Sequence, residues 1–231
     1  MIITFISDTH NKQHEITSQL PGGDLLVFAG DMTSMGKEYE IEEWMDWFYS
    51  LDHYGTKICI AGNHDFFFEK HPDKVEALIS QYDDEINYLE DSSLWLSIDG
   101  SDQNVHIYGS PWQPEFHNWA FNLPRMGDGL DKVWHQIPED VDILITHGPA
   151  CGYLDQVIGR YENLGCELLT DRIKEIKPKI HVCGHIHSGY GYQFDGNTHF
   201  FNASVLDERY NYSQKPMTID WNKETNTVKF L

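Results

Sequence analysis

Five short strings of the sequence combine aspartate, asparagine and histidine with glycine or small polar residues. They are Ser7-Asp8-Thr9-His10, Gly30-Asp31, Gly62-Asn63-His64-Asp65, Thr146-His147-Gly148 and Gly184-His185-Ile186-His187. Imidazole nitrogens combined with carboxylate and amide oxygens suit Mn, Fe, Ni, Mg or Zn, and a soft thiolate set is missing. The flanking glycines let backbone and side chains crowd a small site. Together these strings predict a metal centre that holds two divalent ions.

Each string alone has a simpler interpretation. Asp8 and His10 are compatible with a helix cap or a turn, and Gly30-Asp31 and Gly62-Asn63 are common turn dipeptides. A lone His147 is more often a hydrogen-bonded structural residue than a ligand. If these simpler interpretations all held, metal-type ligands would follow five strands in succession by coincidence. We therefore favour the interpretation that the five strings form one metal site.

The strings follow apolar runs that have the composition of strands. Strand-like runs at 2–6, 24–29 and 57–61 alternate with helix candidates at 12–19 and 37–51. This alternation predicts parallel strands joined by crossover helices. The polar strings then lie at the C-terminal ends of the strands, which is the edge where α/β sheets bind ligands.

The rest of the chain adds more strands than one open sheet holds comfortably. Further helices are expected at 72–82 and 164–176, and the other strands at 93–98, 104–109, 143–146, 180–183, 190–194, 198–202, 216–220 and 226–230. A sheet of this size tends to curl or split in two. We therefore predict one α/β domain over residues 1–231, a four-layer αββα sandwich of two mixed sheets flanked by helices.

The helix expected over 37–51 carries several large apolar side chains at helical spacing. We interpret them as core contacts and not as a cofactor box. They are Tyr39, Trp44, Trp47, Phe48 and Leu51.

The amino-acid composition limits the classes of molecule that the protein is expected to bind and the compartment in which it is expected to act. The chain has 37 acidic and 16 basic residues, a formal net charge of −21, and 13 histidines. A long polyanion would be repelled, so general nucleic-acid binding is disfavoured, whereas divalent cations are compatible with this charge. No apolar run is long enough to span a bilayer, and the N-terminus lacks the features of a signal peptide. Four cysteines without paired spacing are expected to be reduced, which predicts a cytoplasmic protein.

At this point the residues resemble a known family. The calcineurin-like metallophosphoesterases carry D-x-H, G-D, G-N-H-[D/E], H and G-H-x-H in this order, and the chain has all of them between residues 8 and 187. The strings Gly109-Ser-Pro-Trp-Gln-Pro, Thr146-His-Gly-Pro, Gly184-His-Ile-His-Ser-Gly-Tyr-Gly191 and Phe201-Asn-Ala-Ser204 are similar to the metallophosphoesterase-domain-containing subfamily.

The resemblance implies how the ligands divide. One ion would be held by Asp8, His10, Asp31 and His187, and the other by Asp31, Asn63, His147 and His185. Asp31 would bridge the ions, and a hydroxide between them would attack the phosphorus. We expect His64 to protonate the leaving group and Asp65 to orient a neighbouring histidine.

The sequence favours a small phosphodiester as substrate. The Asp-Arg pair of the protein phosphatase branch is missing after Asp31, and no arginine lies within a motif, so a dianionic monoester would lack a bidentate clamp. The aromatic segment 111–121, interpreted as an ordered loop, is either a hydrophobic clasp or a wall of the substrate pocket. As a wall it would supply the substrate-binding residues Trp112, Phe116, His117, Asn118 and Trp119. With the subfamily resemblance, this composition predicts a cyclic nucleotide.

Three alternatives stay open. The same fold serves phosphomonoesterases and nucleases, although the acidic charge argues against a nuclease. A weakly active binding or scaffolding protein is the third, but its expected mark is a missing ligand, and both His185 and His187 are present. The sequence leaves the oligomeric state and the identity of the metals open.

Overall fold

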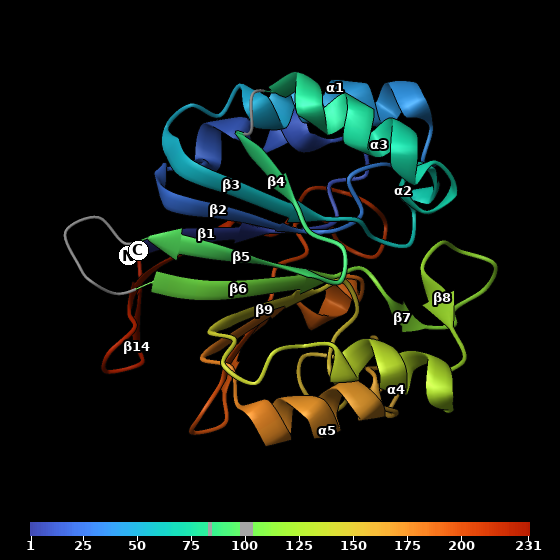
Figure 1. Ribbon diagram of the computed structural model, residues 1–231, viewed down its shortest axis with the longest axis vertical. Coiled ribbons are helices and arrows are strands. Elements are labelled where there is room, and N and C mark those ends of the chain that lie inside the picture. Colours follow the sequence, from blue (N-terminus) through green and yellow to red (C-terminus); the bar gives the residue numbers. More distant parts are fainter. Residues whose placement is uncertain (83–84, 98–103) are drawn as a thin grey trace.

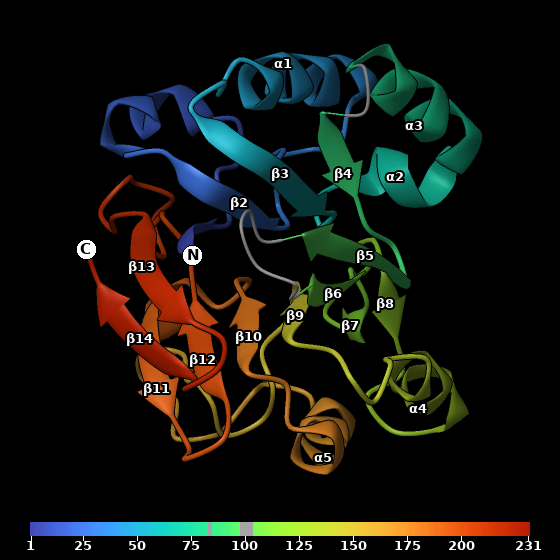
Figure 2. The ribbon, with the colours of Figure 1, turned by 60° about the vertical axis from the view of Figure 1, so that its left-hand side comes forward.

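The computed structural model describes residues 1–82, 85–97 and 104–231. Two sheets lie face to face, with one group of helices outside each sheet (Figure 1). The turned view shows the same four layers, with α1 and α3 above and α4 and α5 below (Figure 2). The predicted αββα sandwich is confirmed.

The first sheet is built from both ends of the chain. Its strands are β1 (Ile2–Ile6), β2 (Gly23–Ala29), β3 (Tyr54–Ile60), β4 (Ile86–Tyr88), β13 (Met217–Asn222) and β14 (Thr227–Phe230). Their order is β14-β13-β1-β2-β3-β4. Strands β1 to β4 are parallel, while β13 runs antiparallel to both β1 and β14. The sheet is therefore mixed.

The second sheet comes from the middle of the chain. Its strands are β5 (Ser92–Ser97), β6 (Asn104–Ser110), β9 (Ile143–Thr146), β10 (Ile180–Cys183), β11 (Gly191–Phe194) and β12 (His199–Asn202). Their order is β11-β12-β10-β9-β6-β5, with antiparallel strands at both edges and parallel strands in the centre. A short ladder joins β7 (Gln113–Pro114) to β8 (Asn122–Leu123). It lies at the end of the sandwich opposite the chain termini (Figure 1).

Alternation along the strands divides the core into layers. In β2, Leu25 and Val27 face the second sheet, whereas Leu26 and Phe28 face the helices. Successive side chains of a strand point to opposite faces, so a strand buried on both sides reads as a continuous apolar run. This explains why the runs at 2–6, 24–29 and 57–61 lack polar alternation.

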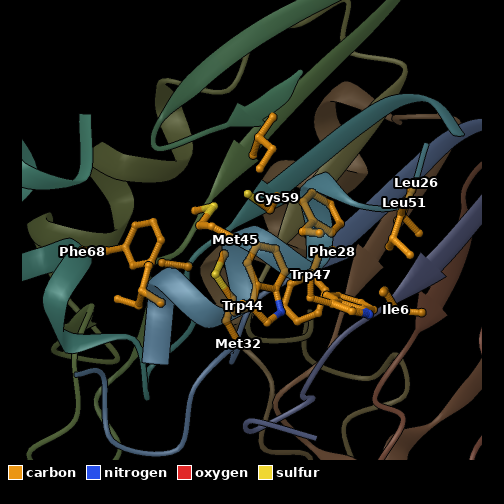
Figure 3. Packing of buried hydrophobic residues seen from close by; sticks show 14 of the residues in the cluster. Ile6, Leu26, Phe28, Met32, Trp44, Met45, Trp47, Leu51, Cys59 and Phe68 are labelled. Atoms are coloured by element: carbon orange, nitrogen blue, oxygen red, sulfur yellow. The ribbon is translucent and has the colours of Figure 1, made fainter. Parts of the chain in front are cut away.

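Helices cover the outer faces of both sheets. Those on the first sheet are α1 (Glu38–Tyr49), α2 (Phe66–Lys70) and α3 (Pro72–Ile79), and those on the second are α4 (Asp128–His135) and α5 (Glu167–Ile176). Trp44 and Trp47 of α1 pack near Phe28 of β2 (Figure 3). The core interpretation of this helix is confirmed for Trp44, Trp47, Phe48 and Leu51. It is wrong for Tyr39, whose side chain is 65% exposed in the first turn.

Several elements differ from the sequence prediction. The segment 12–19 forms two short 3₁₀ turns, Gln13–Glu15 and Thr17–Gln19, in place of a helix. Segment 111–121 contains the two residues of β7, although it was expected to be a loop throughout. Short β4, α2 and α4 were missed because three to eight residues give too little periodicity to recognise. Residue 98, at the end of one expected strand, lies outside the described residues.

Candidate metal centre

The five polar strings meet at one end of the sandwich. Asp8 follows β1, Asp31 follows β2 and Asn63 follows β3 in the first sheet, while His147 follows β9 and His185 follows β10 in the second. A parallel bridge between Ser7 and Ser204 joins the two sheets where β1 and β12 end. Parallel strands in both sheets thus deliver their C-terminal ends to a common edge.

Asp31 lies at the centre of the cluster. Its Oδ2 is 3.6 Å from Nε2 of His10 and 3.4 Å from Nε2 of His147. Its Oδ1 accepts a 2.8 Å hydrogen bond from the backbone N–H of His64. One carboxylate oxygen therefore faces histidines on two sides, and the other oxygen holds the carboxylate in place.

The remaining predicted ligands surround this carboxylate. Oδ1 of Asn63 is 3.0 Å from Nε2 of His147 and 2.7 Å from Nδ1 of His185. Oδ1 of Asp8 is 3.5 Å from Nε2 of His187. All seven predicted ligands are thus brought into one cluster. Three overlapping groups of three residues each have carboxylate or imidazole atoms within 4.8 Å of one another, and one of these groups includes His64.

Backbone carbonyls fix the orientation of three histidine rings. A carbonyl oxygen only accepts, so Nδ1 of each ring must carry the proton and donate it. In the neutral ring this leaves the Nε2 lone pair for a ligand, as is usual for metal-binding histidines. The pairs are His10 Nδ1 with Thr33 O at 3.2 Å, His147 Nδ1 with Ala29 O at 2.9 Å and His187 Nδ1 with Asp207 O at 2.9 Å.

These contacts test whether the residues fit metal ions. Nε2 of His10 is buried without a hydrogen-bond partner among the described residues. Nε2 of neutral His147 would direct a lone pair at the oxygens of Asn63 and Asp31, which is unfavourable unless a cation lies between them. Two ligands about 2.1 Å from one ion in adjacent positions are about 3 Å apart, close to the distances observed here. The donor set fits divalent ions.

Backbone conformation at the ligands is strained. Asp8, His10, Asp31 and His185 all adopt positive φ angles between 42° and 67°. Non-glycine residues rarely occupy this region, and such strain gathers at functional sites.

Two glycines make the crowding possible. A Cβ on Gly62 would lie 2.3 Å from Oδ1 of Asp31, and one on Gly184 would lie 2.2 Å from Oδ2 of Asp8. Side chains at these positions would occupy the space of the two carboxylates. The predicted role of the flanking glycines is confirmed at both positions.

Burial and charge act differently on the histidines. Burial lowers the pKa of His10 to about 4 and that of His185 to about 3, so both rings are neutral at pH 7. Burial also opposes protonation of His147, but the Asp31 carboxylate outweighs it and raises the pKa of His147 to about 9. Burial would raise the pKa of Asp31, but the charge of His147 holds it well below its usual range.

His187 follows the same pattern with Asp8. Burial opposes protonation of His187, but its hydrogen bond and charge interaction with Asp8 raise its pKa to about 9. At pH 7 the extra protons thus reside on His147 and His187, whereas His10, which also lies beside Asp31, is neutral. A divalent ion would displace them, because a ligating imidazole must be neutral.

Comparison with known proteins identifies the family. The model of the family described as "Calcineurin-like phosphoesterase" matches residues 1–189, which include all seven ligands. The chain belongs to the calcineurin-like phosphoesterases. It is therefore a metal-dependent phosphoester hydrolase by family, and the resemblance found in its motifs is confirmed.

Relatives of this phosphoesterase extend the similarity over nearly the whole chain. Metallophosphoesterase domain-containing protein 1 of Homo sapiens is 41% identical over 236 positions, which cover 93% of the chain and 69% of the human protein. UPF0046 protein T07D4.2 of Caenorhabditis elegans is 36% identical, covering 97% of the chain and 61% of the worm protein. A crystal structure of the protein TT1561 of Thermus thermophilus shares the fold, with a TM-score of 0.66 at 12% identity and 99% and 97% coverage of the two chains.

His64 borders the metal centre of the phosphoesterase. Its Nδ1 is 2.8 Å from the carbonyl oxygen of Ser34, and its ring lies edge-on to His10 with centroids 4.6 Å apart. One nitrogen of His64 lies within 4.8 Å of ligand atoms of His10 and Asp31. The side chain is only partly buried, so it lies between the metal ligands and solvent.

Asp65 has a different position from the one expected. Its buried carboxylate accepts hydrogen bonds from the backbone N–H groups of Met32, Thr33 and Gly62 and from Oγ1 of Thr33, at 2.7–3.2 Å. It orients the loop after Asp31 and not a histidine ring directly. Its link to a histidine is indirect, since the carbonyl of Thr33 faces Nδ1 of His10.

The aromatic segment 111–121 reaches the site with only some of its residues. Trp119 stacks on His64 with ring centroids 4.0 Å apart, and Phe116 lies edge-on to His185 at 5.8 Å. Trp112 instead donates its indole N–H to Asp91 and packs against Phe121. His117 and Asn118 are exposed.

A cavity of about 370 Å³ opens beside the metal centre. It is lined by His185 and His187 and by side chains that sequence reasoning missed, including Arg125, Arg160 and Tyr210. The Tyr210 ring is edge-on to His10 at 4.9 Å and to His187 at 5.3 Å. No sequence motif marks these residues, because loops far apart in the chain bring them together.

The two arginines of the cavity differ in availability. Arg125 pairs with Glu167 and donates to the carbonyls of Leu164 and Gly165. Arg160 is exposed, and in the part of the chain that the structure describes its guanidinium has no hydrogen bond or ion pair.

In the same described residues no helix is long and apolar enough to cross a membrane.

Proposed function

We propose that this phosphoesterase hydrolyses small phosphodiesters, and cyclic nucleotides in particular, with two divalent ions. The observation that carries the two-ion proposal is the placement of Oδ2 of Asp31 between His10 and His147. A carboxylate oxygen shared in this way suits two cations about 3.5–4 Å apart. Mn, Fe, Ni, Mg and Zn all accept this donor set.

Each ion would take ligands from loops of both sheets. Asp8, His10 and His187 would complete one ion site with Asp31, and Asn63, His147 and His185 the other. When bound, the ions supply an activated water and neutralise the phosphate oxygens. The protein's own contribution is to fix the rings through backbone carbonyls and to exclude competing geometries through the strained ligand loops.

His64 is proposed as the proton donor to the leaving alkoxide. The carbonyl of Ser34 engages Nδ1, which leaves Nε2 to deliver the proton. The backbone N–H of His64 donates to Oδ1 of Asp31, which fixes the backbone of His64 beside the proposed bridging carboxylate. Asp65 supports this arrangement as a positioning residue for the loop that carries Thr33 and Ser34.

The neighbouring cavity is proposed to hold the nucleoside. Its volume of about 370 Å³ lies within the usual range for small-molecule sites, and Phe116 and Tyr210 form aromatic walls next to the metal ligands. His117, whose ring lies 4.4 Å from that of Phe116, and the exposed Asn118 are proposed to contact the sugar or base from the rim of this wall. Trp112 contributes by supporting the segment through Asp91 and Phe121.

The wider setting follows from composition. A net charge of −21 repels long nucleic acids but does not prevent a small anion from reaching bound cations. All four cysteines are free, as in proteins of reducing compartments, and we propose a cytoplasmic role.

Phosphomonoester hydrolysis is the second candidate, because one observation favours it. Arg160 lines the cavity with a guanidinium that is free of partners among the described residues. Such a group is suited to a dianionic phosphate or to a second phosphate of the substrate. If this candidate is right, Arg160→Ala should raise KM for monoesters far more than KM for diesters whose ester groups carry no charge.

A panel assay tests the function. Metal-free protein would be reconstituted separately with Mn, Ni, Mg, Fe and Zn and given bis(p-nitrophenyl) phosphate, p-nitrophenyl phosphate and 2′,3′- and 3′,5′-cyclic nucleotides. We expect higher kcat/KM for diesters than for monoesters and activity on at least one cyclic nucleotide. A clear preference for monoesters, or for single-stranded DNA, would refute the substrate proposal.

A further inference from the structure

We propose that Trp119 is a positioning residue for His64, holding the imidazole at the angle from which it donates a proton. This inference rests on the proposed role of His64. The two rings are stacked, with centroids 4.0 Å apart and an interplanar angle of 28°. Trp119 was expected to stack on a base, but one face of its indole is already covered by His64.

The other contacts of His64 leave one rotation of its ring free, and Trp119 restricts that rotation. The backbone N–H is fixed by Oδ1 of Asp31 at 2.8 Å, and Nδ1 lies 2.8 Å from the carbonyl of Ser34. A single hydrogen bond at Nδ1 still allows the ring to tilt about that bond. The His10 ring lies nearly perpendicular to the His64 ring, with centroids 4.6 Å apart, and the indole of Trp119 covers a face of His64. Together they define the ring plane.

Trp119 is itself held by the protein. The backbone N–H of the next residue, Ala120, donates to the carbonyl of Asn63 at 3.0 Å, and that of Phe121 donates to Glu69 in α2 at 2.8 Å. The ring of Phe66 lies 5.7 Å from the indole. The aromatic segment is therefore anchored to the same strand-end loop that carries Asn63 and His64.

This geometry predicts which kinetic constant changes. Removal of a positioning residue disturbs the orientation of the proton donor and so lowers kcat on substrates whose leaving group needs protonation. Removal of a residue that stacks on a base would raise KM for nucleotides and leave diesters without a base unaffected. The two roles of Trp119 are therefore separable by measurement.

The test compares Trp119→Leu, His64→Ala and the double variant on two diesters. We expect Trp119→Leu to lower kcat on an alkyl or nucleoside leaving group roughly 10-fold, with KM and metal content unchanged, since aromatic stacking and orientation have effects of this order. Bis(p-nitrophenyl) phosphate, whose leaving group needs no proton, should be nearly unaffected. The double variant should have the same kcat as His64→Ala, because Trp119 acts only through His64.

Matched variants separate positioning from folding. Trp95→Leu removes a similar stack, with His106 at 4.1 Å and 12°, on an exposed edge strand, and should leave both activities intact. Trp119→Phe keeps an aromatic face and should restore most of kcat. In NMR spectra of the Mg- or Zn-loaded protein, the His64 ring protons should shift upfield in the wild type and lose that shift in Trp119→Leu.

The outcomes distinguish the two proposals. If His64→Ala slows both diesters equally or neither, the proton-donor role of His64 is wrong. Suppose that His64→Ala lowers kcat only on the diester with the poor leaving group. The positioning role of Trp119 is then refuted if Trp119→Leu changes KM alone. It is also refuted if the double variant loses kcat by the full product of the two single-variant losses. Absence of the ring-current shift in the wild type would refute it independently of activity.

Discussion

Replacing Asp31 by Asn tests the bridging carboxylate. The change keeps the shape of the side chain, and the amide oxygen still accepts the hydrogen bond that the His64 N–H donates to Oδ1. What is lost is one negative charge at Oδ2, which lies 3.6 Å from His10 and 3.4 Å from His147. Both proposed ion sites should therefore weaken at once, while the fold is kept.

Coulomb's law gives the size of the effect. One charge about 2 Å from a divalent ion is worth about 4 kcal/mol even at the dielectric constant of water. The amide dipole returns part of this, so we expect each ion to bind about 10²–10³-fold more weakly. Activity at micromolar metal should disappear, because neither ion remains bound.

Metal stoichiometry and thermal stability provide the assay. Elemental analysis after gel filtration should find two ions in the wild type and none in Asp31→Asn. Metal at 100 times Kd should stabilise the wild type by about 2.7 kcal/mol per ion, or about 5 kcal/mol for two ions, and leave the variant nearly unchanged. Asp8→Asn is the matched control, because it removes the same charge from a carboxylate assigned to one ion and should leave the other. An Asp31→Asn protein with two ions and normal turnover would show that Asp31 is no bridge.

Three further predictions concern pH and packing. Because the pKa values of His147 and His187 are raised to about 9, metal binding should release protons and strengthen as pH rises toward 9; calorimetry in two buffers that finds no release at pH 7 would contradict this. Gly184→Ala should destabilise the protein by about 1–3 kcal/mol in urea titrations and weaken metal binding, since the new Cβ would lie 2.2 Å from Oδ2 of Asp8; unchanged stability would mean that the loop yields easily. Burial lowers the pKa of His181 to about 3, below the ordinary value of about 6.5 in an unfolded chain, so stability should fall as pH drops from about 6.5 toward 3. His181→Gln should remove about 2 kcal/mol of the loss between pH 7 and 5, and equal pH profiles would argue against a neutral buried ring.

Strands and their polar ends were predictable because both depend on local sequence. Continuous apolar runs of five to seven residues identify strands buried on both faces, as in β2, and glycine next to Asp31 or His185 marks the turn that follows. The short 3₁₀ turns at 13–19 were mistaken for a helix because their apolar spacing does not reveal the hydrogen-bond pattern.

The role of Asp65 shows the limit of reasoning from adjacency. Its position beside His64 indicated a partner for a histidine, yet its carboxylate points toward Thr33, which is 32 residues earlier in the chain. Adjacent residues in a turn face different neighbours, and only the paths of β2 and β3 decide which loop the carboxylate meets.

The sequence by itself determined the donor chemistry of this protein, since the types and order of the seven ligands identify a nitrogen and oxygen metal site and the family. Only the tertiary structure decided how the site is held and approached. Carbonyls of Ala29, Thr33 and Asp207 fix the ligand rings, Trp119 covers His64, and Tyr210 and Arg160 line the cavity. These contacts join loops separated by tens to more than a hundred residues, and such pairings leave no local pattern because they depend on how the two sheets pack.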